Sequence, residues 1–328
     1  MSKPLLKRIN FFLVIGLAFL VLIASIRFTF DSTFELTSSL QNLLNLSISV
    51  IIESTPFIIL GTILSALLQR FVSYEKVNRW LPNNGFLRRA LLSLLGVFVP
   101  VCECGNVPLA RGLILKGFTV PEAITFLLAA PILNPLTIIT TYQAFGWENG
   151  ILIGRIIGGF IIANIIGWYF STQNNTHSLL TEKFEYSCSH AKNHNHQPGV
   201  LKTFIEETNA IMPTVVLGSF IAGGIHALIP QSVLVSIASN PFTAILVMIL
   251  MAFIIAICSN VDAFFALSFA TIFPSYSILI FLLVGPLVDI KMLALLKTTF
   301  RTKTVIKITI LVLILSITIS LGVDVLNV

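Results

Sequence analysis

The residues best suited to do chemistry are two cysteines that flank a glutamate, Cys102, Glu103 and Cys104, in the stretch 99–108. Prolines frame them inside a strongly apolar sequence, and unpaired backbone beside a charged carboxylate must be buried in protein or face a water-filled cavity. A third thiol, Cys258, lies in a second polar interruption. Because thiolates bind soft ions, the sequence predicts a site for a thiophilic cation or metalloid. The alternative is that small residues, cysteine included, allow tight helix packing at these points.

Carboxylates and amides inside or beside apolar segments extend this candidate site. A charged side chain at membrane depth is costly unless it is paired or hydrated, so it is a candidate for ion binding or proton coupling. The thiols, carboxylates and amides that we predict along a substrate pathway are Glu53, Cys102, Glu103, Cys104, Asn106, Asn134, Cys258, Asn260, Asp262 and Asp289. For Asp289 the alternative is a structural ion pair with Lys291 or Arg111.

A second group of metal-binding residue types lies in a long hydrophilic stretch, 171–203. Three imidazoles and a thiol fall within nine residues, and Cys/His-rich tracts of this kind can capture Zn²⁺. The predicted ligands are Cys188, His190, His194 and His196. The alternative is a flexible polar linker that happens to be rich in histidine.

Composition sets the class of protein that must hold these residues. Of 328 residues, 56% are hydrophobic and 10% are charged, and the mean hydropathy is +0.95. These values are typical of an α-helical membrane protein and exclude a soluble domain. The net charge of +6 follows from basic residues in short loops, which set membrane orientation, so we predict no nucleic-acid partner.

Apolar runs long enough to cross a bilayer, about 20 residues each, are the elements that must position the site. They cover residues 9–26, 43–71, 121–142, 151–170, 208–229, 277–296 and 306–323. Two further regions, 86–116 and 241–274, are apolar on both sides of the thiol-bearing interruptions. Each of them predicts a helix, a break and a second helix.

An internal repeat relates the two halves of the chain. Three landmarks recur 155 to 157 residues later, namely Pro56 with Gly61 as Pro213 with Gly218, Cys102 as Cys258, and 131–134 as 286–289. We therefore predict two copies of one unit, 43–170 and 204–325, preceded by an N-terminal transmembrane helix (1–30) and joined by a cytosolic His-rich linker (171–203).

The charge distribution predicts that the two units are inverted. If each broken region doubles back in the membrane, all but two of the 20 basic residues, Arg27 and Arg155, lie at or toward the cytosol, as the positive-inside rule requires. Lys291 and Arg111 count among the cytosolic residues. Each unit then crosses the membrane an odd number of times. The predicted fold is all-α, a polytopic membrane protein of two inverted repeats, each with a broken or re-entrant helical hairpin, plus the extra N-terminal helix.

Three motifs carry a resemblance to a known family: VPVCECGNVPLAR (99–111), GFTVPEA (117–123) and APILNP (130–135). Together with the second-half sequence CSNVD (258–262), they resemble the bacterial predicted permeases of the YraQ/YcgR type, over about residues 43–323. That family is related to the organoarsenical efflux (ArsP-like) permeases. The resemblance implies a role for Cys102, Cys104 and Cys258 in binding trivalent arsenicals, and it implies a partner membrane protein in a two-component permease.

The sequence thus predicts a multi-pass plasma-membrane permease that moves a small soft cation or metalloid by alternating access, coupled to an ion gradient. Because the two units are inverted, we predict that the Cys102 and Cys258 hairpins meet at a site near the middle of the membrane. Its predicted partners are the bilayer, an inorganic or organometalloid substrate and a second membrane protein. The alternative is a membrane subunit, or a metal or redox sensor, that does not itself transport. We predict no cofactor and no enzyme activity, because no nucleotide-binding loop or hydrolase motif accompanies the cysteines.

Overall fold

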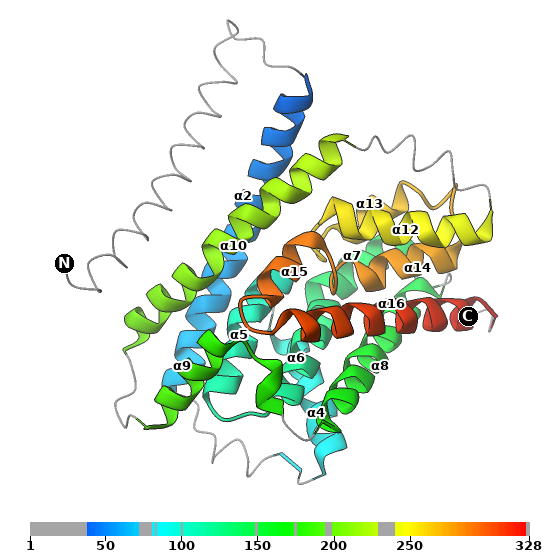
Figure 1. The fold of residues 1–328 in the computed structure, drawn as a ribbon. Helices are drawn as coiled ribbons and strands as arrows, with labels where there is room; N and C mark the ends of the chain where they lie inside the picture. The colour runs from blue at the N-terminus through cyan, green and yellow to red at the C-terminus, as the bar shows by residue number, and fades with distance from the viewer. Residues whose placement is uncertain are drawn as a thin grey trace, which may run out of the picture.

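The structure is a computed structural model that describes residues 38–71, 81–82, 84–99, 101–147, 150–173, 176–193, 199–228 and 240–325. Within these ranges the secondary structure is helical, apart from an isolated antiparallel bridge between Leu180 and Phe300. The elements, drawn in Figure 1, are α2 (Ser38–Phe71), α4 (Gly85–Leu94), η1 (Leu95–Phe98), α5 (Glu103–Leu115), α6 (Val120–Leu133), α7 (Pro135–Phe145), α8 (Ile151–Ser171), η2 (Thr176–Leu179), α9 (Glu182–Asn193), α10 (Val200–Leu228), α12 (Pro241–Ile255), α13 (Asp262–Leu267), α14 (Ser275–Val284), α15 (Ile290–Leu296) and α16 (Thr302–Val325). The predicted N-terminal helix at 1–30 lies outside the described residues.

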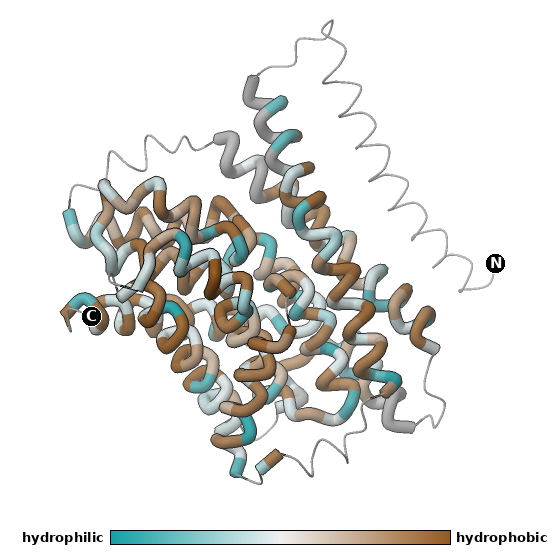
Figure 2. Tube along the Cα trace, turned by 180° about the vertical axis from the view of Figure 1, so that it is seen from behind, coloured by the Kyte–Doolittle hydropathy of each residue, from teal (hydrophilic) through white to brown (hydrophobic). Residues whose placement is uncertain are grey.

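The fold is that of an all-α polytopic membrane protein, as the composition predicts. In the described part of the chain, four stretches are long and apolar enough to cross a membrane: Ser47–Phe71, Val120–Phe145, Ile151–Ser171 and Thr302–Val325. Figure 2 shows brown, hydrophobic residues recurring along the helices, with white and teal residues between them. The predicted spans at 43–71, 151–170 and 306–323 correspond to α2, α8 and α16.

Two apolar runs that were predicted to be single helices are interrupted. The run at 121–142 divides into α6 and α7 at Asn134, and the run at 277–296 divides into α14 and α15 before Asp289. Asn134 is extended because it precedes Pro135, which disfavours the helical region for the preceding residue. In both places the polar side chain caps the helix that follows, Asn134 for α7 and Asp289 for α15.

The two thiol-bearing interruptions are broken helices, as predicted. The chain is extended before α5, and residues 256–261 separate α12 from α13. The backbone carbonyl of Cys102 accepts the N–H groups of the residues three and four positions later, and the carbonyl of Cys258 does the same. The inverted orientation of the two units, and their bounds at 43–170 and 204–325, stay predictions.

Two long helices, α2 and α10, pack side by side next to a bundle formed by the other helices (Figure 1). Helix α2 packs on α5, and α10 packs on α15. The contact between α2 and α5 is backbone to backbone, since a Cβ at Gly61 would overlap the backbone of Gly105. Ser65 on α2 also donates a hydrogen bond of 2.7 Å to the carbonyl of Pro108. These contacts fix the start of α5, where the candidate site lies.

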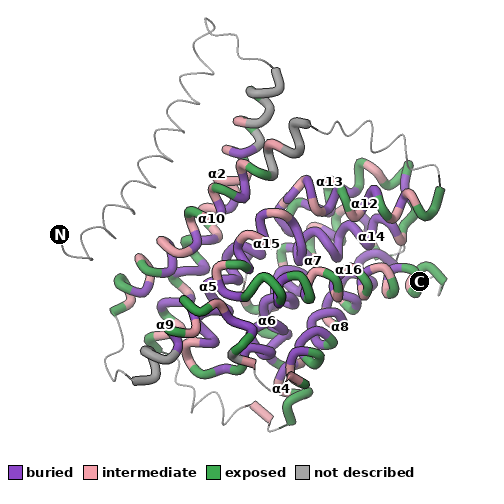
Figure 3. Tube along the Cα trace, viewed as in Figure 1, coloured by how far each residue is buried: buried purple, intermediate pink, exposed green. Residues whose placement is uncertain are grey.

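The core is formed by the short central helices. Every residue of α6 is buried, as is nearly every residue of α5, and α14 is buried from Ser277 to its end at Val284 (Figure 3). Helices α2 and α16 alternate between buried and exposed positions. Many of their exposed side chains are large and apolar, which suits contact with lipid.

The segment between the two units contains more structure than its polar composition predicts. It forms η2 and α9, and α10 already begins inside the predicted linker. Leu180, Phe184 and Cys188 recur every four residues and are buried, so they form one apolar face against the protein. Residues 176–193 therefore form helical structure that packs on the protein, and are not an extended polar chain.

Candidate functional site

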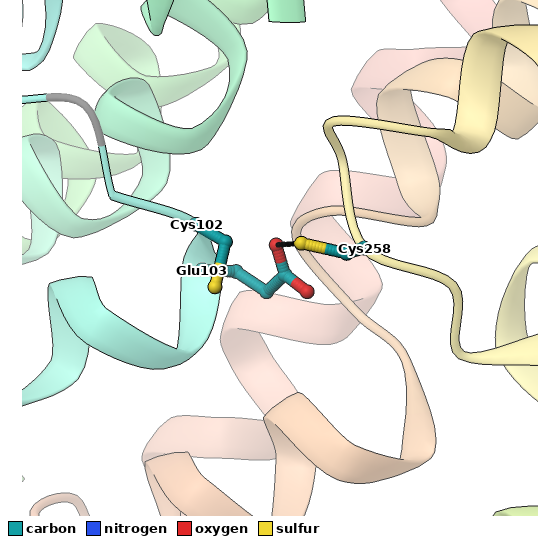
Figure 4. Close-up of side chains that lie close together, drawn as sticks. All are labelled: Cys102, Glu103 and Cys258. Atoms are coloured by element: carbon teal, nitrogen blue, oxygen red, sulfur yellow. Dashed lines mark hydrogen bonds between the residues drawn. The ribbon is translucent and has the colours of Figure 1, made fainter. Parts of the chain in front are cut away.

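The two broken regions meet and bring together side chains that are far apart in the sequence. One ligand atom each from Cys102, Glu103 and Cys258 lies within 4.8 Å of the others, and all three residues are buried. In Figure 4 the Glu103 side chain reaches from the start of α5 toward Cys258, which lies on the loop after α12. The meeting of the Cys102 and Cys258 interruptions, expected from the repeat, is thus present in the structure.

Glu103 is the centre of this cluster and is fully buried. Its Oε2 accepts hydrogen bonds from the Ser259 backbone N–H (3.4 Å), the Ser259 hydroxyl (3.2 Å) and the Cys258 thiol (3.6 Å). It is also the first residue of α5, where the positive end of the helix dipole favours an anion. Every one of these contacts supports a carboxylate at this position.

Lys291 provides the positive charge that Glu103 requires. Its Nζ lies 2.9 Å from Glu103 Oε1, 3.4 Å from the Ala256 carbonyl and 3.9 Å from Asp289 Oδ2, and the side chain is 1% exposed. Lys291 was counted as an orientation signal toward the cytosol, and its burial against Glu103 gives it a structural partner that the sequence analysis did not predict. The position of Lys291 agrees in part with the alternative considered for Asp289, whereas Arg111 pairs with Glu207 at 2.7 Å.

The remaining first-unit candidates surround this cluster. Cys104 is buried and donates to the Ser54 hydroxyl at 3.8 Å, so it faces α2. Asn106 is fully buried, and neither Nδ2 nor Oδ1 has a hydrogen-bond partner among the described residues. Glu53, beside Ser54 on α2, is half-buried and interacts electrostatically with Lys291 and Glu103.

The helix break at Asn134 is tied to both interruptions. Asn134 donates from Nδ2 to the Val101 carbonyl at 3.0 Å, and its Oδ1 accepts from the Leu136 backbone N–H. One helical turn further on, the Thr137 hydroxyl donates to Asn260 Oδ1 at 3.3 Å. The side chains of Asn134 and Asn260 therefore connect α7 to the two interruptions that form the site.

Asp262 forms a separate buried ion pair with Arg155 of α8. The guanidinium binds the carboxylate in bidentate fashion, at 2.9 and 2.5 Å, and also donates to the Thr141 hydroxyl at 2.8 Å. Arg155 is 1% exposed, so its charge is buried within the protein, while its predicted place on the external side of the membrane stays a prediction. An intramembrane cation is expected to have a buried anionic partner, and that expectation could have marked Arg155 as a buried, paired residue from sequence, although not its partner.

The structure does not bring the four predicted ligands of the linker into one described site. Cys188 is buried on α9 with the apolar face of that helix. His190 belongs to α9 but its side chain is not described, and His194 and His196 lie outside the described residues. Metal capture by this group stays a prediction.

The cluster of Cys102, Glu103 and Cys258 has the ligand types that a thiophilic ion requires. Two sulfur ligands bound to one ion at about 2.3 Å would lie about 4 Å apart in tetrahedral geometry, so small side-chain movements bring these atoms into range. All three cysteines of the site, Cys102, Cys104 and Cys258, are free thiols. The arrangement can bind a soft cation or a trivalent metalloid.

Comparison with known proteins gives matches over most of the chain. A family model described as "Predicted permease" matches residues 39–325. The UPF0718 protein YcgR of Bacillus subtilis is 37% identical over 270 residues, which are 81% of this chain and 91% of that protein.

Two further relatives match a large part and a small part of this chain, respectively. A Streptococcus mutans protein named "Putative two-component membrane permease complex subunit" is 34% identical over 279 residues, which are 83% of this chain and 92% of the relative. The UPF0718 protein YraQ of Escherichia coli is 27% identical over 108 residues, 33% of this chain and 31% of YraQ. No solved structure gives a significant match.

Proposed function

Because this chain belongs to the predicted permease family, we propose that it moves a soft cation or a metalloid across the plasma membrane. The binding site is the cluster of Cys102, Glu103 and Cys258. Membership in a permease family favours transport over an intramembrane redox reaction of the cysteines.

The observation that carries this proposal is that both halves of the chain contribute ligands to one buried site. Glu103 comes from the first interruption, while Cys258, Ser259 and Lys291 come from the second half. A site shared by two halves can open to one side and then to the other when the halves move relative to each other. Thiols and a carboxylate are the ligands that select a soft ion over Na⁺ or K⁺.

Alternating access between two inverted units is the proposed mechanism. Asn134 and Asp289 occupy corresponding places, each capping the second part of an interrupted helix, and Cys102 and Cys258 form the same backbone hydrogen bonds. These local equivalences support a repeat that includes residues 43–170 and 204–325. In such transporters the interrupted helices line the substrate site.

Coupling to a proton gradient follows from thiol chemistry. A thiol must lose its proton to become a metal ligand, so binding of the ion at Cys102 and Cys258 releases protons. When protons bind to these thiolates again, they displace the ion. An ion gradient of this kind can drive flux without a nucleotide-binding partner.

A second membrane protein remains part of the proposal. The S. mutans relative is named as a subunit of a two-component membrane permease complex. The same name suits the alternative in which this chain is a non-transporting subunit or sensor whose cysteine site regulates its partner. Transport by the isolated chain separates the two possibilities.

The test is flux of Cd²⁺, Zn²⁺ and a trivalent arsenical into proteoliposomes that contain only this chain. We expect Cys102→Ser and Cys258→Ser each to reduce flux of the transported species by at least about tenfold, because loss of supporting groups around a metal site alone costs 10–100-fold. Cys104→Ser should have a smaller effect, since Cys104 faces Ser54.

Cys188→Ser is the matched control, because Cys188 is a buried cysteine on α9 and not one of the clustered ligands. Flux that survives Cys102→Ser and Cys258→Ser unchanged would exclude the cluster as the binding site. If the native chain alone moves none of these species, and flux appears when the partner protein is added, the result would favour the alternative that this chain is a subunit that does not itself transport.

A further inference from the structure

We propose that Lys291 acts as an internal cation that occupies Glu103 in the empty site, and that the substrate is a thiophilic divalent cation which displaces it onto Asp289. This inference rests on the proposed function and selects the cation over the neutral metalloid. It assigns to Lys291 a role in specificity and in the return of the empty carrier.

The position of the ammonium group is the first reason. Lys291 Nζ lies 2.9 Å from Glu103 Oε1, while Glu103 supplies one of the three clustered ligand atoms. A cation that binds Glu103 would lie close to this ammonium in a buried environment, where like charges repel strongly. Binding of a cation therefore requires Lys291 to move away, whereas a neutral metalloid held by thiols makes no such demand.

Asp289 is suited to receive the displaced ammonium. Its Oδ2 is buried, lies 3.9 Å from Lys291 Nζ and has no hydrogen-bond partner among the described residues. Its Oδ1 accepts from the Met292 N–H at the start of α15, which holds the carboxylate still. A shift of about 1 Å along the flexible lysine chain would form a normal charge-assisted hydrogen bond.

The exchange leaves the net charge of the group unchanged and gives Glu103 a cation in both states. Without substrate, Lys291 lies between the two carboxylates and bonds Glu103, while the thiols keep their protons. With substrate, the divalent cation is held by Glu103 and two thiolates whose protons have been released, and Lys291 neutralises Asp289. An uncompensated carboxylate in the interior is costly, so the lysine allows the empty site to change conformation. The other titratable groups that interact electrostatically with Lys291 are Cys104, Cys258 and Glu53.

The experiment measures Cd²⁺ binding to the purified full-length chain, with Cd²⁺ exchange and net Cd²⁺ flux in proteoliposomes. In Lys291→Met we expect Cd²⁺ to bind about tenfold more tightly or better, because its competitor is gone, and Cd²⁺-for-Cd²⁺ exchange to persist while net flux falls at least about tenfold. Lys303→Met, at an exposed lysine on α16, should leave all three unchanged.

A double-mutant cycle with Asp289→Asn keeps the proposal testable if Lys291→Met folds poorly. Asparagine preserves the helix cap, as Asn134 does for α7. Asp289→Asn should weaken Cd²⁺ binding about tenfold, and this loss should disappear in the Lys291→Met background.

The possible outcomes separate this inference from the proposed function. If the native chain neither binds nor moves Cd²⁺, the proposed cation site itself is wrong. If the native chain binds Cd²⁺ but Lys291→Met binds it equally or more weakly, or loses exchange together with net flux, Lys291 is a structural residue and the displacement is wrong. An equal change in affinity for a neutral trivalent arsenical would overturn the selection of a cation.

Discussion

Replacing Arg155 with methionine is expected to destabilise the protein by about 3–5 kcal/mol, the usual effect of removing one partner of a buried ion pair. The substitution leaves Asp262 buried without its bidentate partner and removes a hydrogen bond to Thr141. The change in the free energy of unfolding is measured by unfolding the purified protein in detergent micelles with heat or denaturant. Lys303→Met, which removes an exposed charge from α16, should change stability by less than about 0.5 kcal/mol.

The double variant Arg155→Met with Asp262→Leu tests the cause of that loss. Replacing both partners of a buried pair with apolar residues is often neutral, so most of the lost stability should return. A double variant no more stable than Arg155→Met would contradict the ion-pair explanation. Flux through the recovered double variant also decides whether Asp262 has a transport role, because a structural pair can be replaced without loss of flux.

Gly61→Ala is expected to destabilise the protein by about 3 kcal/mol, at the upper end for an added methyl group in a packed interior. The new Cβ would overlap the backbone of Gly105, and neither backbone can move aside as a flexible side chain would. Because α2 holds the start of α5, the displacement would also shift Glu103 and reduce Cd²⁺ flux. Thermal unfolding and flux measured on the same preparation check both parts.

Gly322→Ala is the matched control, since a Cβ at Gly322 on α16 would meet no atom within 4 Å. It should leave flux unchanged and, as glycine is a poor helix former, raise stability slightly. Equal behaviour of the two variants would show that α2 and α5 do not approach as closely as Gly61 and Gly105 indicate.

The repeat made the general form of the site predictable from sequence. The offset between Cys102 and Cys258 and the polar breaks around them were sufficient to predict that two interruptions meet. Hydropathy predicted the boundaries of the helices less well, because an average over an apolar window does not detect the helix break at the single residue Asn134. The local rule that a residue before proline avoids the helical region does register it.

The two basic residues that form the buried ion pairs with Glu103 and Asp262 were not identified from the sequence. Lys291 and Arg155 were treated as orientation signals, since most basic residues of membrane proteins lie near the surface. Both fall inside predicted spans, at 277–296 and 151–170, where a charge implies a buried partner. Which carboxylate each one pairs with depends on tertiary contacts 188 and 107 residues apart in the chain, and no local pattern contains that information.

The sequence separation between Glu103 and Lys291 has a consequence for biosynthesis. The two residues are 188 positions apart, so at 5–20 residues per second roughly 10–40 s pass between their synthesis on the ribosome. During that interval the nascent chain carries Glu103 without its lysine, and Cys258, 155 positions after Glu103, is still to be made for most of it. A half-made chain therefore cannot yet contain the complete cluster of Cys102, Glu103 and Cys258.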